Sequence, residues 1–258
     1  MKSIAIIIVL ALFAISAPAQ RKPSRPATAQ KFNLNAEQLP RGFVGDNIAV
    51  IYGQMYSRMR PKGEYETTDQ YRTRLAGAIE AYENRLLAFR FKPPHMPEVN
   101  DDYAFYFVDY NADAQEMTVR VPSKGDPEEL EVNVAGTVSR STYKAQNRFG
   151  VSAAVTRYKG RLYDIVFKWK PGRIRFKFEI PPAQAKIIGD RITTLFIGTP
   201  KTGRPYKSMI RHYDAMPIGP TMDYPYEDLT ETSTIVMDMK EIWIYDRVTM
   251  KVLAKEKQ

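Results

Sequence analysis

The sequence predicts an α+β fold that is mainly antiparallel β, either a sandwich or a partly closed barrel, preceded by an N-terminal αα-hairpin. Three observations predict it. Apolar residues recur at helical spacing up to about Leu86 and alternate with polar residues, at a period of two, beyond it. The alternating segments are short and are separated by turn residues. Strands and helices do not alternate along the chain, which argues against a parallel βαβ fold.

The chain begins with the pattern of a secretory signal peptide, which we assign to residues 1–19. Lys2 supplies a positive charge, and the apolar run from Ile4 to about Ile15 is shorter than the ~20 residues that a transmembrane helix needs. Ala17 and Ala19 form the small-x-small pattern of a cleavage site, so we predict cleavage after Ala19. The alternatives are an uncleaved short anchor and a buried helix, although a core helix would show a polar face, which this run lacks.

Cleavage at this position predicts an exported bacterial protein, located in the periplasm or outside the cell, without a transmembrane helix after processing. The 258-residue chain contains no cysteine, which excludes both disulfide bonds and a lipid-modified N-terminal cysteine. The fold must therefore be stabilised by its own core, for which the chain is long enough. A cysteine-free exported chain of this size is more typical of a bacterial envelope protein than of a eukaryotic secreted one.

Residues 20–31 are basic, rich in proline and nearly free of large apolar side chains, so we expect a disordered tether there. Residues 32–258 show no internal repeat and no second domain boundary. We therefore expect a single α+β domain, with the helical hairpin at about residues 46–86 and the β-rich region at about residues 87–258.

Two helices are predicted in the first part of this domain. Asp46 is the expected N-cap of the first helix, which ends before Pro61 and Gly63. Thr67 and Gln70 form the capping box of the second helix. The connector between them is short, so an antiparallel pair is expected. Their Met- and Tyr-rich apolar stripes are interpreted as core-facing, and a groove for a partner is the alternative.

Strands are expected throughout the remainder, with one short helix at residues 182–190. The predicted strands cover residues 87–91, 103–107, 117–121, 130–134, 151–157, 161–169, 173–180, 191–198, 233–239, 240–246 and 251–257. Residues 143–150, YKAQNRFG, are interpreted as a structural corner anchored by Phe149. Residues 201–228 fit neither period, and long irregular segments in compact domains are often functional, so we expect a functional loop there.

Histidines and carboxylates supply the candidates for catalysis. A metal site is not expected, because the chain has only His95 and His212 and no cysteine, and no cofactor motif is present. His95 lies in a proline-rich bend and is interpreted as structural. His212 and Asp214 would point to the same side of a strand, where the carboxylate can orient an imidazole for general base catalysis. The other loop candidates, carboxylates and tyrosines suited to glycoside chemistry, are Asp223, Tyr224, Tyr226 and Glu227. No serine nucleophile motif is present, so no catalytic residue is assigned.

The strongest functional signal is basic. The net charge is +9, and Lys and Arg residues concentrate between Arg140 and Lys177. Pro171 and Gly172 predict a turn, so the segment around them is interpreted as a hairpin with one apolar and one cationic face. The anion-binding candidates on this hairpin are Lys168, Lys170, Arg173, Arg175 and Lys177. The alternative is a solvated outer face whose charges discourage edge pairing.

These features predict a non-enzymatic binding or interaction module of the bacterial envelope, with a cationic face for an anionic partner. The expected partner is an anionic envelope component, lipid or glycan, or an envelope protein. Nucleic acid is not expected, because it is scarce outside the cytoplasm. The two alternatives are a periplasmic hydrolase that uses the loop carboxylates or the pair of His212 and Asp214, and a structural subunit of an envelope assembly.

Overall fold

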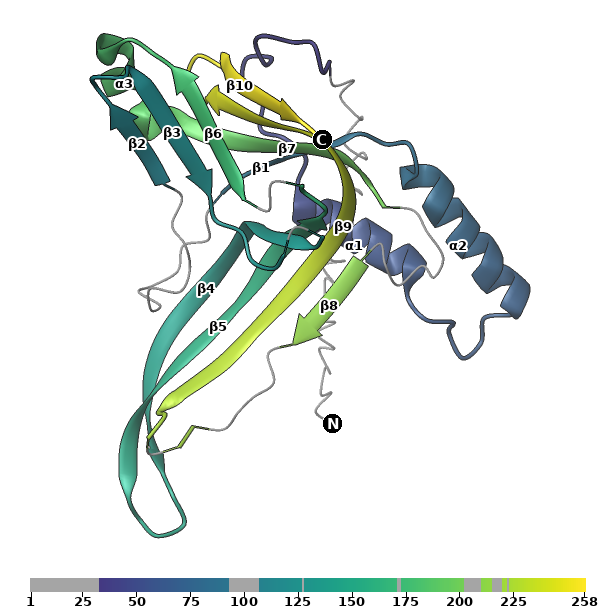
Figure 1. Ribbon diagram of the computed structural model, residues 1–258. Helices are drawn as coiled ribbons and strands as arrows, with labels where there is room; N and C mark the ends of the chain where they lie inside the picture. The colour runs from purple at the N-terminus through teal and green to yellow at the C-terminus, as the bar shows by residue number, and fades with distance from the viewer. Residues whose placement is uncertain are drawn as a thin grey trace, which may run out of the picture. The chain divides into compact units, whose positions relative to one another are not determined.

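The computed structural model describes residues 33–92, 107–126, 128–170, 173–201, 210–214, 220–221 and 223–258. The described part of the chain is mostly β, and its strands form two sheets that do not close into a barrel (Figure 1). Both sheets contribute to one shared hydrophobic core. This confirms the α+β, mainly β class and fits a sandwich-like arrangement. The predicted signal peptide, the predicted tether, His95 and the predicted strand start at Tyr103 lie outside the described residues.

The larger sheet has seven strands, ordered β1-β7-β9-β5-β4, with β8 and β10 also pairing with β9. The strands are β1 (Leu87–Arg90), β4 (Leu130–Gln146), β5 (Ser152–Phe167), β7 (Ile192–Pro200), β8 (Ile210–Asp214), β9 (Tyr226–Asp246) and β10 (Val252–Lys257). The first half of β9 pairs parallel with β5 and antiparallel with β8. Its second half pairs antiparallel with β7 and β10. β9 therefore joins the two halves of this sheet.

Several predicted strands are continuous in the structure. Those predicted at residues 151–157 and 161–169 are joined in β5, which covers Ser152–Phe167, and those at residues 233–239 and 240–246 lie within β9. The prediction that residues 201–228 have no regular structure is wrong, because this segment contains β8 and the start of β9. β8 has only five residues, too few to show a clear period in the sequence.

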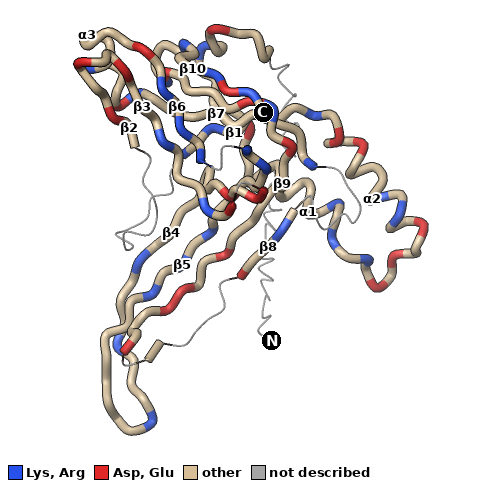
Figure 2. The backbone as a smooth tube through the Cα atoms, viewed as in Figure 1, with Lys and Arg blue, Asp and Glu red and all other residues tan. Residues whose placement is uncertain are grey.

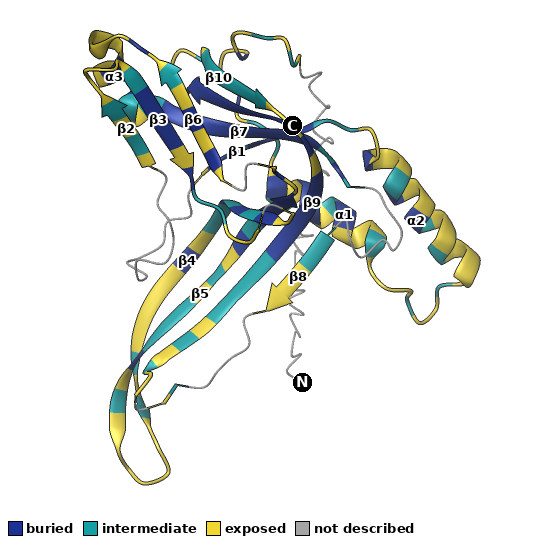
Figure 3. Ribbon diagram, in the orientation of Figure 1, coloured by how far each residue is buried: buried dark blue, intermediate teal, exposed yellow. Residues whose placement is uncertain are grey.

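The smaller sheet has the order β2-β3-β6, with β2 (Phe107–Asn111), β3 (Glu116–Val121) and β6 (Ile174–Glu179). Its inner face packs into the shared core, and its outer face is largely exposed (Figure 3). The predicted cationic hairpin at residues 168–177 is wrong, because β5 and β6 belong to different sheets. β6 pairs with β3 instead, which places Ile174 opposite Val121 and Phe176 opposite Val119. These apolar cross-strand pairs stabilise the smaller sheet.

The helices are α1 (Ile48–Met59), α2 (Thr68–Tyr82) and α3 (Pro182–Ile188). The N-cap of α1 is Asn47. The sequence prediction of Asp46 is therefore wrong. The Oδ1 atom of Asn47 accepts bonds from Ala49 N at 3.1 Å and from Val50 N at 3.3 Å. Asp46 instead accepts a bond from Ala88 N at 2.8 Å. Its carboxylate therefore ties the start of α1 to β1.

The capping box predicted for α2 is confirmed, because the side chains of Thr67 and Gln70 each accept the backbone N–H of the other residue. The antiparallel αα-hairpin is not confirmed. α1 packs into the shared core through four buried residues, Ile48, Ile51, Tyr52 and Met55. The connector between the helices is stabilised by Arg74, which donates to Glu66 at 2.7 Å and to the carbonyl of Arg60 at 3.2 Å.

A second, smaller core lies apart from the first. Its buried residues are Leu39, Phe43, Ala88, Leu195, Ile197, Trp243 and Tyr245. Leu39 and Phe43 come from the segment before α1, and the others come from β1, β7 and β9. The half of the larger sheet around β7 is therefore mostly buried, whereas the distal parts of β4 and β5 are mostly exposed (Figure 3).

Candidate functional sites

The five cationic candidates predicted from the sequence fall into two places. Lys168 and Lys170 follow the end of β5, whereas Arg173 precedes β6, and Arg175 and Lys177 lie on β6. Two of the five form ion pairs. Lys168 pairs with Glu128, and Lys177 pairs with Glu116 at 2.5 Å. The candidate cations of the smaller sheet that pair with no described carboxylate, Arg173 and Arg175, are therefore near the start of β6.

Arg120 adds a cation that sequence reasoning missed. It lies directly opposite Arg175 in the register of β3 and β6. Its Cζ atom lies 5.4 Å from the ring centroid of Phe107, the residue opposite it on β2. Neither arginine forms an ion pair with a carboxylate of the described residues. We refer to Arg120 and Arg175 as the outer arginine pair. Like charges directly opposite each other are destabilising, so a bound anion would offset a real repulsion.

The charge changes along the same face of the smaller sheet (Figure 2). The next row of cross-strand neighbours after the outer arginine pair consists of Asp109, Thr118 and Lys177. The row after that consists of Asn111, Glu116 and Glu179. The acidic side chains Glu116 and Glu179 therefore offset the positive charge at one end of this face. The cationic part is confined to the opposite end, which carries Phe107.

The structure brings His212 and Asp214 together, as the sequence predicted. His212 Nε2 lies 3.1 Å from Asp214 Oδ1. On its other side, His212 Nδ1 lies 3.5 Å from the hydroxyl of Ser233. Ser233 is the residue opposite His212 in the β8–β9 register and is only 2% exposed. Sequence reasoning missed Ser233, because only the strand register places these three side chains in one line.

Aromatic and charged groups surround Ser233. Tyr52 of α1 contacts Tyr163 edge-on, with ring centroids 6.3 Å apart. Burial raises the pKa of Tyr52, and the neighbouring Ser233 opposes that rise. The buried hydroxyl of Tyr52 has no hydrogen-bond partner among the described residues. Two residues along β9, Glu231 accepts from Arg161 Nε at 3.0 Å, which lowers the pKa of Glu231. Ser233 therefore lies near Tyr52 and two residues along β9 from the ion pair of Glu231 and Arg161.

The other predicted loop residues do not converge on His212. Glu227 accepts from Arg157 Nε at 2.5 Å and from the hydroxyl of Tyr143 at 3.2 Å. The bond from Arg157 lowers the pKa of Glu227, which suits a structural carboxylate and not a general acid. Tyr224 and Tyr226 contact each other at 5.7 Å between centroids, and both are exposed. Asp223 is also exposed.

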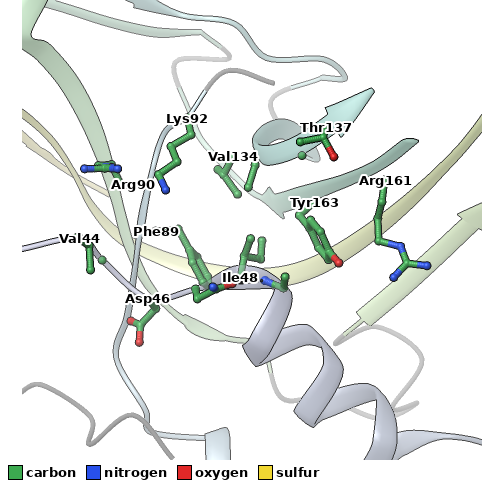
Figure 4. A pocket seen from close by; sticks show the side chains of 15 residues that line it. Val44, Asp46, Ile48, Phe89, Arg90, Lys92, Val134, Thr137, Arg161 and Tyr163 are labelled. Carbon is green, nitrogen blue, oxygen red and sulfur yellow. Dashed lines mark hydrogen bonds between the residues drawn. The ribbon is translucent and has the colours of Figure 1, made fainter. Parts of the chain in front are cut away.

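A cavity of about 510 Å³ lies between the start of α1, the end of β1 and the middle of β4 and β5 (Figure 4). Its apolar lining includes Ile48, Phe89 and Val134. The amine of Lys92 points into the space above Phe89. Arg161 also lines the cavity, but its guanidinium binds Glu231. The cavity contains none of the site residues that the sequence predicted.

No known protein family, no curated protein and no solved structure matches the chain. Its function must therefore be argued from its own residues. The described residues contain no group of three His, Asp or Glu side chains arranged to hold a metal ion. Among the helices of the described part, none has the length and apolar character to cross a bilayer.

A buried carboxyl, Asp164 on β5, lies near the half-buried Glu131 on β4. Asp164 is only 4% exposed and accepts a bond from Asn133 Nδ2 at 2.6 Å. Burial raises the pKa of Asp164 to about 8, and the neighbouring Glu131 contributes to the rise. The buried hydroxyl of Thr234, which is opposite Asp164 on β9, has no hydrogen-bond partner among the described residues. We expect Asp164 to be largely protonated at neutral pH, with consequences for stability.

Proposed function

We propose that the protein is a non-enzymatic, exported binding module that contacts an anionic component of the bacterial envelope through the outer arginine pair. One observation supports this proposal most directly. Arg120 and Arg175 lie opposite each other, without an ion-pair partner among the described carboxylates. A guanidinium binds phosphate, sulfate or carboxylate groups through two parallel hydrogen bonds, so one anion can bridge two arginines.

Neighbouring side chains add to this surface. Arg173 is exposed and precedes β6, and Phe107 is 45% exposed beside Arg120. An exposed aromatic ring beside a guanidinium gives the ligand an apolar surface in addition to the charge. The site is therefore suited to an anionic group carried on a larger molecule, such as a sugar chain or a lipid headgroup. The export part of the proposal rests on the pattern of residues 1–19.

Replacing both members of the outer arginine pair tests this proposal. We expect Arg120→Ser combined with Arg175→Ser to weaken binding to heparin by about 10- to 30-fold at low salt, because each arginine contributes about 1 kcal/mol near an anionic surface. Binding by the unmodified protein should fall as salt rises. The measurement is heparin affinity across a salt series, with anionic vesicles as a parallel arm that separates a glycan from a lipid source.

A control variant with the same loss of charge is Arg41→Ser combined with Lys62→Ser, since both residues are exposed and lie outside the smaller sheet. This control should bind heparin almost as tightly as the unmodified protein. Equal losses in the two double variants would show that net charge, and not the outer arginine pair, drives binding. That result would contradict the proposal.

A second candidate function has one specific observation in its favour, the line formed by Ser233, His212 and Asp214. In this arrangement the hydroxyl of Ser233 attacks an ester carbonyl carbon while His212 Nδ1 takes its proton. Asp214 holds the proton on Nε2. The alcohol leaves with the proton from His212, and water then hydrolyses the acyl group from Ser233. Because Ser233 is only 2% exposed, neighbouring side chains would have to move before a substrate could reach its hydroxyl.

Hydrolysis of p-nitrophenyl acetate tests the second candidate. If it is correct, Ser233→Ala removes activity above the uncatalysed rate, and Asp214→Asn lowers it by at least about 100-fold. Ser57→Ala is the control, because this exposed serine lies on α1 and its hydroxyl donates to the carbonyl of Gln54. Equal rates for the unmodified protein and Ser233→Ala would exclude the hydrolase.

A further inference from the structure

The hairpin formed by β4 and β5 continues past its last partner strand. β9 pairs with β5 as far as Thr156, which lies opposite Tyr226. Beyond this point, β4 and β5 pair only with each other among the described residues (Figure 1). At about 3.4 Å per residue, this two-stranded ribbon is roughly 15–20 Å long. We refer to residues 144–151 as the hairpin tip.

The hairpin tip has a well-bonded turn. Asn147 Oδ1 accepts from Phe149 N at 2.9 Å and from Val151 N at 3.0 Å. Gly150 takes a left-handed conformation, with φ of +83°, which glycine adopts without strain. These bonds hold the side chain of Phe149 outward, where it is 75% exposed. The predicted turn in residues 143–150 is therefore confirmed, but the prediction that Phe149 anchors it is wrong.

The distal part of this hairpin, residues 139–163, carries charge of one sign only. Residues 139–163 contain no Asp or Glu, and their six cations are Arg140, Lys144, Arg148, Arg157, Lys159 and Arg161. Two of these, Arg157 and Arg161, pair with glutamates of β9. Lys144 and Arg148, at the tip, are exposed and form no ion pair with the described carboxylates. The positive charge at the tip is therefore not neutralised by the described part of the fold.

Apolar side chains accompany the unpaired cations. Arg148 Cζ lies 4.8 Å from the ring centroid of Phe149, and Val151 is 48% exposed. A preorganised turn therefore presents one aromatic ring, one aliphatic side chain and two cations together. An aromatic side chain flanked by basic residues is the combination that suits the interface of an anionic bilayer, where rings enter the headgroup region and cations contact phosphates.

We propose that the hairpin tip docks on the surface of an anionic lipid bilayer. Phe149 and Val151 enter the headgroup region, and Lys144 and Arg148 contact lipid phosphates. The ribbon is long enough for the tip to reach the roughly 5–10 Å depth of interfacial binding while the sheet stays outside the bilayer. This surface lies on the larger sheet and does not depend on the outer arginine pair.

Sedimentation with vesicles tests the proposal, using the chain from Gln20 so that the apolar N-terminal stretch does not bind by itself. The vesicles contain equal parts of phosphatidylglycerol and phosphatidylcholine, or phosphatidylcholine alone. We expect Lys144→Ser combined with Arg148→Ser to weaken binding to the anionic vesicles by about 30-fold, or about fivefold for each charge. Phe149→Ser should weaken it by about tenfold, through lost apolar burial.

Matched variants control for charge and for exposed aromatic area. Arg41→Ser with Lys62→Ser removes the same charge elsewhere, and Tyr65→Ser removes an aromatic ring that is 92% exposed in the connector between α1 and α2. Both should change vesicle binding by less than about twofold. Arg120→Ser with Arg175→Ser should lower heparin affinity and should not remove the vesicle binding that Lys144 and Arg148 provide. Losing vesicle binding only with that last variant would overturn the docking of the tip without contradicting the outer arginine pair.

Fluorescence gives a second readout that does not depend on affinity. The native Trp169 and Trp243 are 1% and 0% exposed, so Phe149→Trp would place a tryptophan in a far more exposed position. Its emission should shift to the blue with anionic vesicles and stay unchanged with phosphatidylcholine alone. Binding without a blue shift would mean that the tip stays in water, which would overturn the proposal. Tip-dependent binding to a protein partner and not to vesicles would also overturn it.

Discussion

Asp164→Asn is expected to stabilise the protein at pH 8 by about 1–3 kcal/mol, because the buried carboxyl of Asp164 is costly to ionise. Burial and Glu131 raise its pKa from 3.8 to about 8. Between these two pH values the folded protein binds one proton more than the unfolded chain. The free energy of unfolding therefore falls as pH rises through this window, by at most about 1.4 kcal/mol per pH unit.

The measurement is urea unfolding of the unmodified protein and Asp164→Asn between about pH 5 and 8. The asparagine variant should lose most of the pH dependence in this range. Asp238→Asn is the matched control, because Asp238 is an exposed aspartate of β9. The shifted pKa of Glu66 affects stability in a different pH range. Arg74 lowers the pKa of Glu66 to about 2, so that stabilisation is lost only as pH falls below about 4.5. Parallel slopes for the unmodified protein and Asp164→Asn would refute the assignment of the pH dependence to Asp164.

Gly160→Ala is expected to destabilise the protein by about 3 kcal/mol or more, because an added methyl group has no room between β4 and β5. A Cβ atom on Gly160 would lie 2.7 Å from Val138 Cα and even closer to the carbonyl oxygen of Thr137. Both are backbone atoms of the paired strand, so the strands themselves would have to separate.

Gly77→Ala adds the same methyl group but is expected to raise the free energy of unfolding. Gly77 lies in α2 with no atom within 4 Å of the added Cβ, so alanine should stabilise the protein by about 0.5–1 kcal/mol through higher helix propensity. Urea unfolding of both variants measures the difference. A loss below about 1 kcal/mol for Gly160→Ala would mean that β4 and β5 are less tightly apposed than the structure shows.

Local signals predicted local structure well. The capping box at Thr67 and Gln70 predicted the start of α2, because both hydrogen bonds join residues three apart. Alternating apolar residues predicted most strands, because burial of one face acts on each strand separately. The N-cap of α1 was misplaced by one residue, because Asp46 and Asn47 are both good caps and only contact with Ala88 decides between them.

Strand register is the feature of the fold that local sequence patterns do not predict. The position of Arg120 opposite Arg175 depends on the pairing of β3 with β6, and the position of Ser233 beside His212 depends on the pairing of β8 with β9. Each pairing is set by apolar matches between distant segments. The exposure of Phe149 was missed for a related reason. A large aromatic residue is usually buried, but this ribbon has no third strand or helix of the described chain to cover it.

The position of β9 in the chain also determines when the larger sheet can form during synthesis. β5, β7, β8 and β10 all take β9 as a neighbour, and β9 begins only at Tyr226. A ribosome releases the N-terminal strands first. Until residues 226–246 have emerged, β5 and β7 have no strand between them, and the sheet cannot assemble around its central member. A nascent chain that has emerged only as far as residue 225 therefore leaves the larger sheet open, with the edges of β5 and β7 unpaired by β9.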